Sequence, residues 1–163
     1  MKKVIIVRHA KSSWTDFSLS DFDRPLDNRG HNDAVYMAAR LKESGHIPQR
    51  IITSSAVRAK TTAQYFSKVL DIPVEESRDL YHGQAEDYLD IVKSLDEKTE
   101  CIAMFGHNPG ITFLANLIDM GCTDNIPTCG IVIAEVKSAE WAKSEWDNMK
   151  LIEIMMPKNG GNG

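Results

Sequence analysis

The sequence predicts a three-layer α/β/α fold in which a mostly parallel central sheet is flanked by helices. Short runs rich in apolar residues occupy 3–7, 50–53 and 101–105, and such continuous runs are typical of strands covered on both faces. Segments with helical periodicity separate these runs. Because strands that alternate with helices usually pair in parallel, we expect one α/β sheet.

Apolar spacing predicts the helices that cover this sheet. Residues 32–44 place Ala34, Met37, Ala38 and Leu41 on one stripe, and residues 57–70 repeat the pattern. A third helix is predicted over 85–95, and a fourth begins at Pro109. Each helix is expected to bury its stripe against one face of the sheet.

The remaining segments complete a single domain over residues 1–157. Residues 130–136 and 146–156 are predicted strands that finish the sheet at one edge. Residues 12–27 mix polar and apolar side chains around Arg24-Pro25 and are predicted to form an ordered loop. The length of 163 residues fits one domain, and residues 158–163 are expected to be a disordered tail.

The composition argues against several classes of protein. Apolar residues make up 42% and charged residues 26% of the chain, and the net charge of −4 gives the surface as a whole no attraction for nucleic acid or anionic lipid. No stretch approaches the roughly 18 apolar residues of a transmembrane helix. We therefore expect a cytoplasmic protein without membrane or nucleic-acid partners. Cys101, Cys122 and Cys129 lack the spacing of a disulfide framework or a zinc site, so no metal is predicted.

Cationic and imidazole side chains follow three of the predicted strands. Arg8 and His9 end the first strand, Arg58 comes shortly after the second, and His107 follows the third. The carboxyl ends of parallel strands form the ligand crevice of open α/β sheets, so these side chains are expected to converge. Helices begin at the last two junctions, where Asn108 fits an N-cap, and their N–H groups favour an anion.

Two arginines and two histidines suit phosphoryl transfer. Arg8 and Arg58 can each present a planar fork to phosphate oxygens. A neutral nitrogen of His9 can attack phosphorus in line and form a phosphohistidine that water then hydrolyses. His107 would stabilise charge on the transferring group, an effect worth about 2.7–4 kcal/mol per donor. This scheme needs neither a metal nor a cofactor.

The motifs around these residues resemble the histidine phosphatase, or phosphoglycerate mutase-like, superfamily over nearly the whole chain. The segment 7–14, which begins Val7-Arg8-His9, is similar to the Arg-His-Gly signature of that superfamily. Further motifs are most similar to the small SixA-type phosphohistidine phosphatases, namely 24–26 (Arg-Pro-Leu), 54–62 (Ser-Ser-Ala-Val-Arg-Ala-Lys-Thr-Thr) and 106–109 (Gly-His-Asn-Pro).

This resemblance implies a phosphoglycerate mutase-like fold and a role for each site residue. His9 would be the phosphorylated nucleophile, with Arg8, Arg58 and His107 holding the phosphoryl group. Arg24 would lie at the pocket rim and Asn108 would contact the substrate, although an arginine at position 24 can also simply pair with an aspartate of its own loop.

The chain departs from the family pattern at two places. Ala10 and Lys11 stand where relatives carry glycine and frequently glutamate, which weakens the case for mutase activity. Many relatives supply a general acid from the segment after the second helix. Here Glu86 is the first candidate and His82 the second, although an acidic residue at a helix start also stabilises the helix dipole.

The weakness of this acid site favours phosphohistidine as the substrate. An imidazole leaving group, whose conjugate acid has a pKa of about 6.5, needs less protonation than the alkoxide of a phosphate ester. The sequence therefore predicts a metal-independent phosphatase that acts on phosphohistidine in a protein. A small phosphate ester is the alternative substrate, and a module that binds phosphorylated proteins without turnover is the alternative from another functional class. The sequence does not predict an oligomeric state.

Overall fold

A computed structural model describes residues 1–157, so the predicted tail 158–163 lies outside the described residues. The described chain forms a six-stranded sheet in the order β3-β2-β4-β1-β5-β6. Strands β3, β2, β4 and β1 are parallel, whereas β5 is antiparallel to β1 and β6 is antiparallel to β5. The bounds of the strands are β1 Lys3–Arg8, β2 Arg50–Ser54, β3 Val74–Ser77, β4 Cys101–Gly106, β5 Ile131–Val136 and β6 Met149–Met155.

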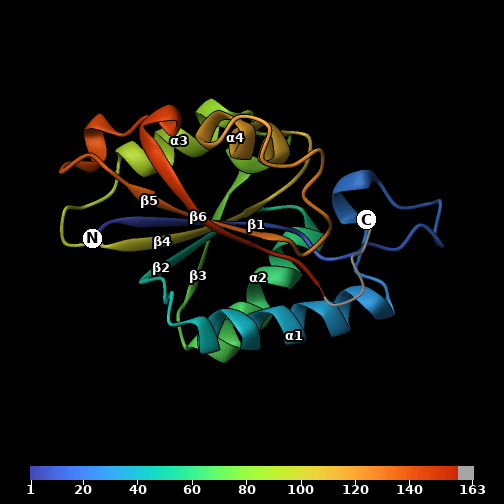
Figure 1. Ribbon diagram of the computed structural model, residues 1–163. Helices are drawn as coiled ribbons and strands as arrows, with labels where there is room; N and C mark the ends of the chain where they lie inside the picture. Colours follow the sequence, from blue (N-terminus) through green and yellow to red (C-terminus); the bar gives the residue numbers. More distant parts are fainter. Residues whose placement is uncertain (158–163) are drawn as a thin grey trace.

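Helices cover both faces of the sheet (Figure 1). On one face lie α1 (Asn28–Ser44) and α2 (Val57–Leu70), and on the other lie α3 (Ala85–Lys93) and α4 (Gly110–Ile118). The predicted three-layer α/β/α arrangement with a mostly parallel sheet is therefore confirmed. Within residues 1–157, no helix combines the length and the apolar character needed to cross a bilayer.

The central strands send side chains into two cores. Along β1, Val4 and Ile6 belong to the core beneath α3 and α4, while Ile5 and Val7 belong to the core beneath α1 and α2. All four side chains are fully buried. Because successive residues of a strand point to opposite faces, a strand covered on both sides has a continuous apolar sequence.

Capping residues set the ends of the helices. The structure begins α1 at Asn28 rather than at the predicted 32, because an Asp27 carboxylate oxygen accepts a hydrogen bond from the N–H of Gly30 at 2.7 Å. Gly45, with a φ of 81°, ends the same helix. At the start of α4 the N-cap is Pro109 instead of Asn108, and Asn108 Oδ1 accepts from the N–H of Thr112 at 3.0 Å.

The two edges of the sheet differ from the prediction in detail. Strand β3 was not predicted, because its sequence Val-Glu-Glu-Ser has no buried alternation. It forms by pairing with β2, and an ion pair of 2.7 Å joins Arg50 to Glu75 across the two strands. At the opposite edge, a 3-10 turn over Trp146–Asn148 precedes β6, so that strand is shorter than predicted.

The loop 12–27 is ordered as predicted. It contains a short 3-10 helix, η1 (Asp21–Asp23), and an isolated bridge joins Ser12 to Leu26. The loop lies beyond the carboxyl end of β1 (Figure 1). It is therefore placed to form one wall of a site at that end of the sheet.

Candidate active site

The carboxyl ends of β1, β2 and β4 bring the four predicted side chains together. Arg8 ends β1 and His9 follows it, Arg58 lies in the first turn of α2 after β2, and His107 follows β4. The ring centroids of His9 and His107 are 5.3 Å apart. Burial lowers the pKa of Arg8, and the positive charge of nearby Arg58 lowers it further, so the two guanidinium groups lie close enough to repel each other. His9, Arg58 and His107 are each only 7% exposed.

His9 is held as a neutral imidazole with one nitrogen available. Its Nδ1 lies 2.7 Å from the carbonyl oxygen of Ala10, and because a carbonyl only accepts, Nδ1 carries the proton. Burial lowers the pKa of His9 well below its usual value, and although the Ala10 carbonyl raises it, His107, Arg58 and Arg8 lower it further. In the neutral ring, Nε2 therefore keeps its lone pair, as a nucleophile requires.

His107 is neutral as well and is oriented by a serine and a tyrosine. Its Nε2 lies 2.7 Å from Ser54 Oγ, and its backbone N–H donates to Tyr88 Oη at 3.2 Å. Burial, followed by the charge of Arg58, lowers the pKa of His107 to about 3, although Asp21 raises it. Within residues 1–157 the buried Nδ1 atom has no hydrogen-bond partner. In the tautomer that carries its proton on Nδ1, this nitrogen can donate a hydrogen bond to a phosphoryl oxygen.

A backbone carbonyl forms one wall of the site. The oxygen of Ile126 accepts from Arg8 Nη1 at 2.9 Å and from Asn108 Nδ2 at 3.0 Å. Asn108 is thereby fixed beside Arg8, and it also lines the cavity described below. Its position agrees with the predicted substrate contact, while the contact itself stays a prediction.

Asp21 holds Arg58 in place. The Arg58 guanidinium donates from Nη1 to the backbone oxygen of Asp21 at 2.7 Å and from Nη2 to Asp21 Oδ2 at 3.0 Å. Tyr81 Oη donates to the same carboxylate oxygen at 2.7 Å. Partial burial raises the pKa of Asp21, but hydrogen bonds from Tyr81, Arg58 and Arg24 outweigh this effect and hold the pKa well below its usual range. Asp21 is therefore an anion at neutral pH.

Arg24 supports the site from the loop. It donates from Nη1 to Asp21 Oδ1 at 3.0 Å and from Nε to the carbonyl of Ser13 at 3.1 Å, and its Nη2 bonds Ser12 Oγ. Its guanidinium carbon lies 3.2 Å from the ring centroid of Trp14. The aspartate pairing considered from the sequence is thus present. Arg24 is 7% exposed and does not line the cavity.

A cavity of about 380 Å³ opens in front of these groups and is here named the strand-end pocket. Its lining residues come from the loop 12–27, the start of α2, the segment before α3 and the β4–α4 junction; they are Asp21, Arg58, His82, Gly83, Gln84, His107, Asn108, Pro109 and Gly110. Arg8 and His9 lie beyond this lining, next to Arg58 and His107. The cavity falls within the size range of ordinary ligand sites.

The two candidates for the general acid are separated by the structure. His82 lines the strand-end pocket and has a φ of 61°, whereas Glu86 lines a different pocket. Among the described residues that line the strand-end pocket, Asp21 is the one carboxylate, and its pKa is lowered. The described structure therefore offers no carboxylic acid at this pocket.

Sequence reasoning considered Asp21 or Asp23 only as a partner of Arg24 and missed the contacts of Asp21 with Arg58 and Tyr81; it also missed the roles of Tyr81 and Tyr88. Asp21 and Tyr81 lie in segments without regular periodicity, and their meeting across 60 positions follows only from the fold. Tyr88 lies in the helix predicted over 85–95 and is fully buried, and the sequence gives no separate signal for its hydroxyl.

No resident metal is indicated by the described residues. Within 1–157, no group of three or more His, Cys, Asp or Glu side chains is placed to hold a metal ion. Cys101, Cys122 and Cys129 are free thiols, and burial raises the pKa of each of them.

The chain is similar to proteins of one family. The family model of the histidine phosphatase superfamily (branch 1) matches residues 4–98. An uncharacterized chloroplastic protein of Arabidopsis thaliana is 30% identical over 154 residues, which cover 88% of this chain and 70% of that protein.

Solved structures share the fold at lower identity. SixA of Agrobacterium tumefaciens superposes with a TM-score of 0.83 at 22% identity, covering 96% of this chain and 98% of that chain. The protein histidine phosphatase SixA complexed with tungstate gives a TM-score of 0.80 at 23% identity, with the same coverage of 96% and 98%. These matches confirm the predicted phosphoglycerate mutase-like fold and its likeness to SixA.

Proposed function

Since the chain belongs to the histidine phosphatase superfamily, we propose that it hydrolyses phosphohistidine in a protein through a phosphorylated intermediate on His9. The observation that carries this proposal is the chemistry of the strand-end pocket. Arg58 and His107 line it, Arg8 and the neutral His9 lie directly behind them, and the one lining carboxylate is held as an anion by its hydrogen bonds.

The first step transfers the phosphoryl group to the protein. Nε2 of His9 forms a bond to phosphorus as the bond between phosphorus and the substrate imidazole breaks. Arg8 and Arg58 bind the phosphoryl oxygens, and His107 donates to one of them from Nδ1 in the tautomer that accepts a hydrogen bond from Ser54 Oγ at Nε2. The departing nitrogen takes up a proton from water or from His82.

The second step returns the protein to its starting state. Water attacks the phosphorus of phosphorylated His9, the bond from phosphorus to Nε2 breaks, and inorganic phosphate leaves. The Nδ1 proton stays hydrogen-bonded to the Ala10 carbonyl throughout, so the ring keeps its orientation. No metal enters either step.

The leaving group of phosphohistidine suits the strand-end pocket better than the leaving group of a phosphate ester does. An alkoxide needs a strong proton donor in the pocket, and Asp21 cannot supply a proton near neutral pH because its pKa is lowered. An imidazole leaves with little help, because its conjugate acid has a pKa of about 6.5.

The proposal is tested by phosphate release from several substrates in the presence of EDTA. We expect turnover of a phosphohistidine protein to exceed that of phosphoserine, sugar phosphates and nucleotides, and we expect EDTA to leave it unchanged. A strong preference for the small esters would reverse the choice of substrate.

The covalent step has its own test. The variant His9→Ala should lose at least about 10³-fold in turnover, and acid-labile phosphate should be trapped on His9 of the unmodified chain. The matched control is His46→Gln, because His46 contacts Lys3 at the opposite end of β1. Binding without any trapped phosphate or turnover would instead indicate a phosphoprotein-binding module.

A further inference from the structure

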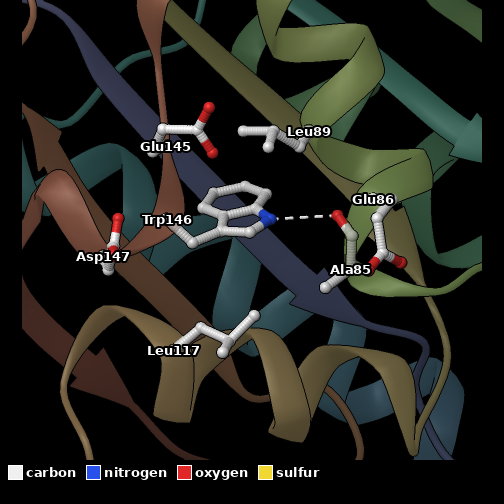
Figure 2. Close-up of a pocket in the computed structure, with 7 residues that line it drawn as sticks. All are labelled: Ala85, Glu86, Leu89, Leu117, Glu145, Trp146 and Asp147. Carbon is white, nitrogen blue, oxygen red and sulfur yellow. Dashed lines mark hydrogen bonds between the residues drawn. The ribbon is translucent and has the colours of Figure 1, made fainter.

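A second pocket, of about 260 Å³, lies on the side of the sheet that carries α3 and α4 (Figure 2). It is here named the side groove, and its lining residues are Ala85, Glu86, Leu89, Leu117, Glu145, Trp146 and Asp147. None of these residues lines the strand-end pocket.

The floor of the side groove is apolar. The residue Trp146 is 4% exposed, and its Nε1–H already donates to the carbonyl of Ala85 at 2.9 Å. Figure 2 shows the ring between Leu89 and Leu117. The ring therefore offers a ligand its carbon surface and π-electrons rather than its N–H group.

The rim of the side groove is acidic. Figure 2 shows the carboxylates of Glu86, Glu145 and Asp147 around the indole. Glu145 is paired with Lys93 at 3.2 Å, whereas Glu86 and Asp147 form no ion pair within the part of the chain that the structure describes. An apolar floor beneath free carboxylates suits a side chain with an aliphatic stem and a cationic end, which is the chemistry of lysine and arginine.

The side groove is close to the strand-end pocket. Gln84 lines the strand-end pocket and the next residue, Ala85, lines the side groove. Along α4, Gly110 lines the strand-end pocket and Leu117 lines the side groove, and seven residues of helix span about 10 Å. Between them on the same helix face, Phe113 is 60% exposed.

We propose that the side groove binds a lysine or arginine side chain of the substrate protein while the phosphorylated histidine of that protein occupies the strand-end pocket. This inference rests on the proposed function and adds a determinant of substrate choice to it. Charge complementarity selects the occupant, because an acidic side chain would be repelled and an uncharged apolar one would leave the carboxylates without a partner.

Phosphohistidine peptides provide the test. One peptide carries lysine three residues from the phosphohistidine, a separation of about 10 Å in an extended chain, and its partner carries alanine there. Phosphoimidazole serves as a substrate without side chains. We expect the lysine peptide to show a roughly tenfold lower KM than the alanine peptide, and we expect added salt to reduce this difference.

A groove variant and a matched control connect this preference to the side groove. The groove variant carries two substitutions, Leu117→Lys and Asp147→Asn, which add one positive charge and remove one negative charge at the lining. It should abolish the lysine preference and leave the turnover of phosphoimidazole unchanged. The control Val35→Lys/Glu43→Gln makes the same changes at exposed positions of α1, across the sheet, and should retain the preference.

The possible results separate the two proposals. An unmodified chain that hydrolyses phosphoimidazole and both peptides equally would overturn the side-groove proposal and leave the proposed function intact. A lysine preference that survives in the groove variant would also overturn it. A difference in sedimentation between the groove variant and the unmodified chain, each measured without substrate, would overturn it as well, because the groove would then bind a second copy of the chain. Failure to hydrolyse any phosphoramidate would overturn the proposed function itself.

Discussion

At the scale of single residues, one aspartate organises two arginines that the sequence leaves unconnected. Asp21 receives hydrogen bonds from Arg58, Arg24 and Tyr81, although it lies in an exposed loop. Because Arg58 already has a carboxylate partner, its fork is oriented before any phosphate arrives. The orientation of this arginine therefore depends on a residue outside the family signature.

The lowered pKa of Asp21 makes a prediction about stability. A carboxylate whose pKa is lower in the folded state stabilises the fold above its unfolded pKa of about 3.9, and this contribution is lost as the pH falls through the folded pKa. The Asp21 side chain is 44% exposed, so Asp21→Asn should lower the free energy of unfolding at pH 7 by only about 0.5–1 kcal/mol. Urea unfolding should show this difference shrinking below about pH 4.

A neighbouring aspartate provides the control for this measurement. Asp23 belongs to the same 3-10 helix, and its carboxylate accepts from Ser20 Oγ at 2.9 Å instead of from an arginine. Asp23→Asn should have a smaller effect. An Asp21→Asn difference that grew in acid would contradict the predicted direction of the pKa shift.

The four residues at the strand ends could be predicted from the sequence, and the residues around them could not. Arg8, His9, Arg58 and His107 follow strands whose direction the alternating pattern already implies, so their convergence is a matter of topology. Asp21 has no such marker, because a mixed polar loop permits many conformations and only the packed fold selects one.

At the scale of elements, a close contact fixes α3 against β4. A Cβ atom at Gly106 would clash with Tyr88 Oη, and the same hydroxyl accepts the backbone N–H of His107. Tyr88 is fully buried in the core between α3 and the sheet. The position of His107 thus depends on how the helix packs on the strand.

This contact predicts coupling between two substitutions. Gly106→Ala should cost about 1–3 kcal/mol of stability by overpacking, and Tyr88→Phe about 1 kcal/mol by removing a hydrogen-bond acceptor. In the double variant the missing hydroxyl removes the closest part of the clash, although the ring carbon Cζ stays 2.8 Å from the added Cβ, so the combined loss should fall short of the sum by about 1 kcal/mol in denaturant unfolding. Strictly additive losses would show that the two groups do not interact.

Elements buried on both faces or along a full stripe were predictable, and elements held by their neighbours were not. The bounds of α2 agree with the sequence prediction because its apolar stripe runs its whole length. Strand β3 presents two glutamates and exists because β2 offers it hydrogen bonds, which no local pattern records.

At the scale of the whole molecule, the strand-end pocket joins segments that are far apart in the chain. Its lining residues come from the loop before α1, the start of α2, the segment before α3 and the start of α4. An anion bound there would hold all of these segments together, so we expect ligand binding to stabilise the entire fold.

Tungstate, a tetrahedral oxyanion like phosphate, is a suitable ligand for this measurement. At a concentration 100-fold above its Kd it should stabilise the folded state by about 2.7 kcal/mol, which corresponds to a rise in Tm of roughly 5–10 °C. Arg58→Met should remove most of this rise, and chloride at equal ionic strength should produce none. A rise that persisted in the variant would place the anion elsewhere.

The reversal of direction at β5 decides which chemical groups close the site. Because β5 runs antiparallel to β1, the segment that enters β5, rather than one that leaves a strand, meets Arg8. It does so through main-chain atoms: the carbonyl of Ile126 accepts from Arg8, and that of Gly130 accepts the N–H of Arg8 at 3.1 Å. A peptide carbonyl is present whatever the side chain, so this wall can keep its chemistry while its amino acids change, and sequence motifs will not record it.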